Sequence, residues 1–201
     1  MFVAKLLAVR AFRGKINNMT EQDIKDLVLK DEWMMKVLRA AEVLELPDWW
    51  IGAGFLRNKV WDALEGLETG KSRDVDLVYF NPDDAQAETD WDYDEYMKKE
   101  YPFADWEVRN QVRMHYVNNA EPYTSTADGI SNWVETATCV AVRLKGDEPE
   151  LLFCHGTSDL LGLVARPIEA FRTLELLPVF RKRVAEKKWR ERWPHLQVVE
   201  E

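Results

Sequence analysis

The sequence predicts an α/β (α+β) protein in which helices pack against a mixed β-sheet of about five strands. In the first half of the chain, short apolar runs typical of strands are separated by segments with the apolar spacing of helices. In the second half, two strand-like runs flank a turn at residues 145–149, which indicates a hairpin. Strands joined through helices, followed by an antiparallel hairpin, together predict a mixed sheet.

The length and composition are those of one soluble globular domain, residues 1–201. A chain of 201 residues with 46% hydrophobic residues buries a sizeable core. We expect this core within about residues 20–170, followed by a basic helix at about 178–193. No apolar run reaches the ~18 residues of a membrane span, and the apolar start of the chain lacks the features of a signal peptide. The expectation is a cytoplasmic protein without a membrane partner.

Each predicted element follows from a local pattern. Thr20, followed by acidic residues, is typical of a helix start, and apolar residues at helical spacing then predict one broken helix or two short helices over 20–45, ended by Pro47. The remaining predicted elements are a strand at 48–53, a helix at 54–66, a strand at 74–80, an acidic and partly helical segment at 81–100, a strand at 106–114, a loop with a short helix at 118–131, strands at 136–144 and 151–154, a short helix at 157–163 and a helix at 178–193.

Two aspartates in an apolar strand are the first candidate site. Asp74 and Asp76 are two residues apart, and side chains two apart on a strand point to the same face. Two carboxylates so close repel each other, and a divalent cation would relieve that repulsion. Mg²⁺ is commonly held by one or two carboxylates together with substrate phosphates, so the pair predicts a magnesium site.

A glycine-rich turn lies upstream of these aspartates, between a predicted strand and a predicted helix. Its residues Gly52, Ala53 and Gly54 begin the helix that also carries Arg57. A turn of this kind offers backbone N–H groups at a helix N-terminus, which bind phosphates. The turn and the aspartates together predict a site for a metal ion and a triphosphate.

The predicted strand at 106–114 supplies a polar wall. Its even positions are mostly apolar and its odd positions are polar, so one face meets the core and the other meets solvent or a site. Glu107, Arg109 and Arg113 lie on the polar face. The two arginines contact either phosphate or acceptor, or they form ion pairs with the acidic segment at 81–100, which is itself expected to be a solvated face.

These motifs carry a resemblance to the nucleotidyltransferases. Gly52-Ala53-Gly54-Phe55-Leu56-Arg57-Asn58, followed by Asp74-Val75-Asp76, is similar to the signature of the head domain of tRNA CCA-adding enzymes and bacterial poly(A) polymerases, which is Gly-Gly-x-Val-Arg-Asp, a helix and Asp-x-Asp. Ala53 and Gly54 stand where that family has Gly-Gly. Arg57 matches the family arginine, and Asn58 replaces the family aspartate.

A smaller bacterial family of nucleotidyltransferase-like proteins is similar over roughly residues 20–170. The elements that carry this second resemblance are Asp74-Val75-Asp76-Leu77-Val78-Tyr79-Phe80, Asn110-Gln111-Val112-Arg113-Met114-His115, Pro122-Tyr123-Thr124-Ser125, Glu135-Thr136-Ala137-Thr138 and Asp159-Leu160. It implies the same fold and does not identify the acceptor, the preferred base or the oligomeric state.

The resemblance implies a nucleoside triphosphate (NTP) as substrate and two Mg²⁺ ions held by Asp74 and Asp76. It implies that the glycine turn lets the backbone approach the triphosphate and that Arg57 offsets phosphate charge. Many such enzymes have a third carboxylate on a neighbouring antiparallel strand. Glu107 is the candidate, Glu135 is the alternative, and a third carboxylate could also be absent.

Three functions follow from these motifs. The first is a Mg²⁺-dependent transfer of a nucleoside monophosphate from an NTP to a small-molecule or protein acceptor. The second is a catalytically silent nucleotide-binding or interaction module that retains the fold, suggested by the departures at Ala53 and Asn58. The third is RNA end modification using the basic helix at 178–193, although that helix is more simply a solvated face, and a net charge of −9 disfavours nucleic acid as the main partner.

Overall fold

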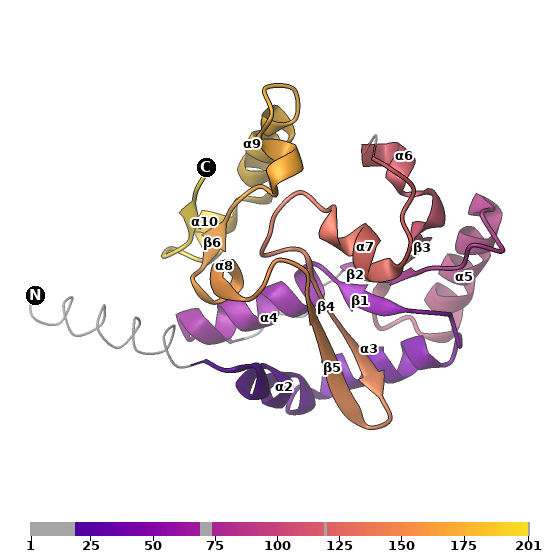
Figure 1. Cartoon of the computed structure of the whole chain (residues 1–201). Coiled ribbons are helices and arrows are strands. Elements are labelled where there is room, and N and C mark those ends of the chain that lie inside the picture. Colours follow the sequence, from indigo (N-terminus) through magenta and orange to yellow (C-terminus); the bar gives the residue numbers. More distant parts are fainter. Residues whose placement is uncertain (1–18, 69–73, 119, 201) are drawn as a thin grey trace, which may run out of the picture.

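The computed structural model describes residues 19–68, 74–118 and 120–200, and it confirms a mixed five-stranded sheet with packed helices. The strand order is β3-β2-β1-β4-β5 (Figure 1). Strands β2 and β3 are parallel, and β1 pairs antiparallel with both β2 and β4. The strands are β1 (Trp50–Gly52), β2 (Asp74–Tyr79), β3 (Asp105–Asn110), β4 (Val140–Lys145) and β5 (Glu148–Phe153), and a separate parallel pair is formed by β6 (Val164–Ala165) and β7 (Gln197–Val198).

Helices cover both faces of the sheet. They are α2 (Glu21–Leu29), α3 (Glu32–Glu42), α4 (Gly54–Glu65), α5 (Ala87–Glu100), α6 (His115–Asn118), α7 (Thr126–Ser131), α8 (Ser158–Leu161), α9 (Leu177–Lys187) and α10 (Trp189–Arg192), with 3₁₀ turns η1 (Gln111–Arg113) and η2 (Glu169–Arg172). None of the helices in the described part of the chain is long and apolar enough to cross a membrane.

The two faces of the sheet have different cores. On one face, residues such as Ile51 and Leu77 pack with α2, α3 and α4 in the larger core. On the opposite face, Trp50 and Val78 belong to a smaller apolar cluster with Ile130 of α7. The smaller cluster fills only part of its face, and the rest of that face carries the polar side chains of the candidate site.

The segment 20–45 forms two helices, each with its own cap. Thr20 accepts a hydrogen bond from the backbone N–H of Asp23 at 3.2 Å, and the Asp23 carboxylate accepts one from the Thr20 N–H at 2.8 Å. Asp31 caps α3 by accepting from the N–H groups of Trp33 and Met34, both at 3.1 Å. These side chains satisfy N–H groups that have no partner within a helix, so both helix starts are encoded locally.

Several predicted boundaries were wrong. The strand expected at 151–154 already begins at Glu148, within the segment 145–149 that was expected to be a turn. The strand expected at 106–114 ends at Asn110, whose side chain accepts from the N–H of Val112 at 3.1 Å and starts the turn η1. The strand expected at 136–144 begins only at Val140, because the preceding residues form a tight turn on Glu135. The helix expected at 178–193 is divided into α9 and α10 at Lys188, which has a φ of 49°.

The acidic helix α5 covers the edge of the sheet. Asp94 accepts from the N–H of Val108 at 2.6 Å, and Asp90 accepts from the N–H of Asn110 at 3.0 Å. Residues four apart on a helix rise by about 6 Å, and residues two apart on a strand by about 7 Å, so the two spacings match. The carboxylates therefore satisfy N–H groups of an edge strand that would otherwise be unpaired. The expectation of a solvated acidic face holds for the outer side of α5 and was wrong for Asp90 and Asp94, which are buried.

We predict that Asp94→Ala lowers the free energy of unfolding by about 2–4 kcal/mol, because it leaves the Val108 N–H and the Arg109 guanidinium without their partner. Urea denaturation measures the change. The matched control is Asp92→Ala, on the exposed side of the same helix, which should change stability by less than about 0.5 kcal/mol. Equal effects of the two substitutions would contradict a role of α5 in closing the sheet edge.

Candidate active site

Carboxylates from two neighbouring strands share one face of the sheet. Asp74 and Asp76 lie on β2, and the parallel register places Asp105 opposite Asp74 and Glu107 opposite Asp76. Opposite residues in a sheet point to the same side, so Glu107 lies on the same face as the two aspartates. The strand that carries Glu107 is parallel to β2, which corrects the expectation of an antiparallel neighbour.

Asp76 is the electrostatic centre of this group. Burial, followed by the negative charges of Glu107 and Asp74, raises the pKa of Asp76 to about 6 from 3.8, and the charges of Arg183 and Arg57 oppose the rise. Burial disfavours an ionised carboxylate, and like charges add to that effect. Asp76 therefore lies in a place that would favour a bound cation.

The donor set fits Mg²⁺ that is shared with a ligand. In the described residues, no three Asp, Glu, His or Cys side chains are arranged to hold a metal ion by themselves. Magnesium sites in phosphate-handling proteins typically take one or two carboxylates from the protein and further oxygens from phosphates and water. Asp74 and Asp76 match this pattern, with Glu107 facing the same side.

The turn before α4 is strained at an alanine. Ala53 has φ 54° and ψ −126°, a conformation that glycine adopts easily and residues with a Cβ rarely do. The space next to Gly52 is filled by Trp133, since a Cβ on Gly52 would lie 2.4 Å from the ring. Gly52 thus makes room for Trp133 to pack on the turn. The positive φ occurs at the next residue, Ala53.

Helix α4 begins beside the aspartates without a cap. Ala53 at the N-cap makes no side-chain hydrogen bond to the first turn, and this turn has no acidic residue, in contrast to α2 and α3. Uncapped N–H groups and the helix dipole attract an anion. Gly54 starts the helix, and a Cβ there would lie 3.2 Å from the Asn58 amide nitrogen.

Arg57 is buried in the wall of the site. Its Nη1 donates to Thr138 Oγ1 at 2.6 Å, and its Nη2 donates to Asn58 Oδ1 at 2.9 Å. The guanidinium lies 5.1 Å from the Trp61 ring and 4.5 Å from the Trp189 ring. Burial lowers the pKa of Arg57 to about 10, partly offset by the charge of Glu135, so the group remains positive at neutral pH.

Glu135 is already paired with cations and hydroxyls. It is fully buried, its Oε1 lies 2.7 Å from Nε of Arg183, and its Oε2 accepts from Thr138 Oγ1 at 2.8 Å. A continuous polar chain therefore runs from Arg57 through Thr138 and Glu135 to Arg183. This chain joins α4 to α9, which are far apart in the sequence.

The C-terminal segment forms a wall of the site that sequence reasoning missed. Arg183 and Lys187 of α9 line cavities at the aspartates, whereas the basic helix was expected to be a solvated face. The segment is held to α4 by Asp62, which accepts from Nη2 of Arg192 at 2.6 Å and from Nε1 of Trp193 at 2.9 Å. The partners are some 130 residues apart, so no local pattern predicts this contact. The signal that the sequence offers is a pair of tryptophans near the C-terminus, Trp189 and Trp193, which are typical of a buried segment.

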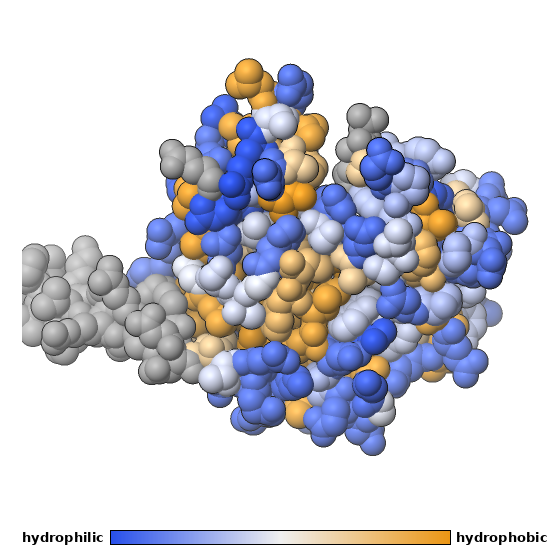
Figure 2. Space-filling model, viewed as in Figure 1, coloured by the Kyte–Doolittle hydropathy of each residue, from blue (hydrophilic) through white to orange (hydrophobic). Residues whose placement is uncertain are grey.

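Two cavities meet at Asp76. Both are lined by Ala53, Asp76 and Arg183. The first, of about 220 Å³, is rich in cations, and the second, of about 280 Å³, is mostly apolar. The other residues that line the cationic cavity are Gly54, Arg57, Asn58, Asp74, Lys187, Trp189, Arg192 and Trp193. The other residues that line the apolar cavity are Val78, Arg109, Gln111, Met114, Val117, Tyr123, Gly129, Trp133, Val134 and Thr138. Figure 2 shows the surface hollowed between the lobes that carry α9 and α6.

Arg109 and Arg113 both pair with α5. Arg109 Nη1 lies 2.7 Å from Asp94, and Arg113 forms an ion pair with Asp90. Of the two readings left open by the sequence, the structure therefore shows pairing with the acidic segment. Arg109 also lines the apolar cavity and is half-buried, so one side of it faces the site.

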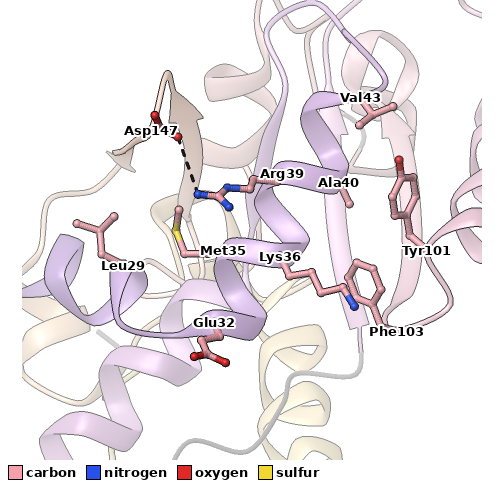
Figure 3. Close-up of a pocket in the computed structure, with 10 residues that line it drawn as sticks. All are labelled: Leu29, Glu32, Met35, Lys36, Arg39, Ala40, Val43, Tyr101, Phe103 and Asp147. Carbon is pink, nitrogen blue, oxygen red and sulfur yellow. Dashed lines mark ion pairs between the residues drawn. The ribbon is translucent and has the colours of Figure 1, made fainter.

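A third and larger cavity, of about 780 Å³, lies elsewhere, along α3 (Figure 3). Lys36 lies over the Phe103 ring at 4.1 Å, and Arg39 pairs with Asp147 at 3.9 Å. None of its lining residues belongs to the two cavities at Asp76. It therefore takes no part in the candidate site.

We predict that Ala53→Gly stabilises the protein by about 0.5–1 kcal/mol, since relief of the strained φ outweighs the extra freedom of the unfolded chain. The matched control is Ala63→Gly inside α4, which should destabilise by about 1 kcal/mol. Thermal unfolding of the three proteins gives the comparison. A lower Tm for Ala53→Gly would contradict strain at this turn.

We predict that Asp76→Asn raises the stability of the metal-free protein by on the order of 1 kcal/mol at pH 8, or about 2–4 °C in Tm. The folded pKa of about 6 is above the unfolded value of 3.8, so the folded protein holds the proton more tightly, and ionisation costs stability as the pH rises through this window. The gain should fade as the pH falls from 6 to 4. Asp92→Asn, on the surface, should show no such trend. A lower Tm for Asp76→Asn at pH 8 would overturn this interpretation.

Comparisons with known proteins agree with this fold. A solved NMR structure described as a CCA-adding enzyme head domain is 29% identical, with a TM-score of 0.80 over 92% of this chain and 100% of that one. A CCA-adding enzyme in complex with CTP is 14% identical, with a TM-score of 0.49 over 84% of this chain and 47% of that one. No curated protein matches at a significant level. A family model described as nucleotidyltransferase matches residues 39–198, and the chain therefore belongs to this nucleotidyltransferase family.

Proposed function

We propose that this protein is a Mg²⁺-dependent nucleotidyltransferase that transfers a nucleoside monophosphate from an NTP to a small-molecule or protein acceptor. The observation that carries the proposal is the position of Asp76, at the boundary between a cationic cavity and an apolar one. A triphosphate is highly charged and matches the cationic cavity, whereas a nucleoside or an acceptor is less charged and matches the apolar one. The reacting phosphorus would then lie where the two cavities meet.

The cationic cavity suits the triphosphate. It contains the uncapped start of α4, which offers N–H groups, and the positive side chains of Arg57 and Arg183. Phosphate oxygens bind strongly to helix N-termini and to guanidinium groups. Arg57 is held by Thr138 and by the two tryptophan rings, so its charge is fixed in place before a ligand arrives.

The carboxylates suit the metal. Asp74 and Asp76 would hold Mg²⁺, with two ions expected, and Glu107 is the candidate for a third carboxylate because it faces Asp76 across the strand pair. When bound, Mg²⁺ would offset the charge that develops on the attacking and leaving oxygens. The protein itself would hold the phosphates, exclude water and keep the carboxylates on one face.

The apolar cavity suits the nucleoside or the acceptor. Its walls include the aromatic rings of Tyr123 and Trp133 and the polar groups of Arg109 and Gln111. A pocket of this size and composition can hold one ring system with a few directed hydrogen bonds. A nucleophile of the acceptor would form a bond to the α-phosphorus, and the bond from the α-phosphorus to the oxygen that bridges it to the β-phosphate would break. Pyrophosphate would then leave, and the acceptor proton would pass to solvent.

A transfer assay tests this function. Each of the four NTPs labelled at the α-phosphate is incubated with Mg²⁺, the purified protein and cell extract, and we expect label on one class of acceptor. Label at the γ-phosphate should leave with pyrophosphate instead. Asp76→Asn should reduce transfer at least 100-fold, and EDTA should abolish it, while Asp92→Asn should behave as wild type.

Transfer that survives Asp76→Asn would refute the proposed site. No transfer to any acceptor, combined with an NTP-dependent rise in Tm that requires neither Mg²⁺ nor Asp74, would instead favour a catalytically silent nucleotide-binding module.

A further inference from the structure

Helix α9 is fixed beside the cationic cavity by the segment that follows it. Trp189 and Trp193 pack edge-to-face on Trp61 of α4, with ring centroids 5.9 and 4.9 Å apart. The last residues continue as β7, which pairs with β6 (Figure 1). Because Trp189 and Trp193 are buried against α4, they hold the C-terminal end of α9 next to this helix.

Arg183 lines both cavities that meet at Asp76. Its Nε is in charge contact with Glu135 at 2.7 Å, without the alignment of a hydrogen bond. Within residues 19–68, 74–118 and 120–200, no hydrogen bond engages its Nη1 or Nη2. A guanidinium has five N–H donors in a planar fork, so contact through Nε leaves the outer edge to bind an anion.

Lys187 lies one helical turn further along the same side of α9 and lines the cationic cavity. It is exposed, and no ion pair holds it in the described part of the chain. The other two cations of the cavity are already engaged, Arg57 by Thr138 and Asn58 and Arg192 by Asp62. Arg183 and Lys187 therefore have terminal nitrogens that no hydrogen bond or ion pair within the described residues engages, and these nitrogens can bind a ligand.

We propose that Arg183 and Lys187 bind the β- and γ-phosphates of the NTP and hold the pyrophosphate as it leaves, with Glu135 as the residue that positions Arg183. This inference rests on the proposed function and assigns the C-terminal helix α9 to the catalytic machinery. When the bond between the α- and β-phosphates breaks, its electron pair stays on the pyrophosphate oxygen. Two cations beside that oxygen offset the new charge.

The location distinguishes the leaving group from the acceptor. The cavity that Lys187 lines also contains the start of α4 and Arg57, whereas the apolar cavity on the other side of Asp76 contains neither. Attacking and leaving groups approach the phosphorus from opposite sides in phosphoryl transfer. Lys187, which lines only the phosphate side, is therefore placed to contact the leaving group, and Arg183 lies where the two cavities meet.

Binding of Mg²⁺-pyrophosphate, measured by isothermal titration calorimetry, tests this inference without knowledge of base or acceptor. Arg183→Gln should weaken binding about 10–100-fold, and Lys187→Gln about 3–10-fold. The matched controls are Arg181→Gln and Lys182→Gln on the same helix, which change the net charge equally and pair with Glu200 and Glu186 outside the cavities. Both should bind as wild type does.

Arg183→Gln leaves Glu135 buried without its cation, so the double variant Arg183→Gln with Glu135→Gln is measured beside it, and thermal unfolding confirms that each protein is folded. If the variants of 183 and 187 bind as tightly as those of 181 and 182, this inference is wrong and the proposed function stands. If wild type itself binds no Mg²⁺-pyrophosphate, both this inference and the triphosphate site fail.

Discussion

Repulsion among carboxylates on one face of the sheet is the constraint on which the rest of the site depends. Asp74, Asp76 and Glu107 share that face because strand periodicity and the register of β2 with β3 require it. Without compensation, these charges would push the strands apart or take up protons. The chain brings cations to them from two distant segments: Arg57 on α4 and Arg183 on α9. Burial, and after it the charges of Glu107 and Asp74, still raise the pKa of Asp76, as expected of a site that awaits a further cation.

Elsewhere the same kind of residue has a structural use. Asp90 and Asp94 are also buried carboxylates, but backbone N–H groups and arginines satisfy them fully, and they close the edge of the sheet. The difference lies in what surrounds each group. On α5, each carboxylate faces donors that a strand presents at a matching spacing. On β2, the carboxylates face each other and two cavities. Burial alone therefore does not identify a functional acid, whereas burial next to other acids does.

Local patterns were sufficient to predict the elements that create the site. The apolar strand with Asp74 and Asp76, the glycine turn and the start of α4 were predicted within a few residues, because each depends on neighbours in the sequence. The wall formed by α9 was not predicted, because its position depends on Asp62 and Trp61 meeting Arg192, Trp189 and Trp193 across the whole chain. Periodicity shows which face of a helix is polar, but it does not show which polar residues fold back on a distant partner. The same limit applies to β3, where one side chain of Asn110 stops a strand that the alternation would have continued.

Helix α4 links these parts. Its first residue follows the strained turn at Ala53, its first turn carries Arg57, and its last two turns hold the C-terminal segment through Asp62 and Glu65. Because a packed core transmits strain, we expect a change at one end of this 12-residue helix to affect the other end. In the proposed function, the start of α4 and the cations of α9 bind the same phosphates, so these two parts must keep a fixed relation. Under the proposed function, the tryptophans near the C-terminus would therefore serve the chemistry as well as the core, because they set the distance between two positively charged walls.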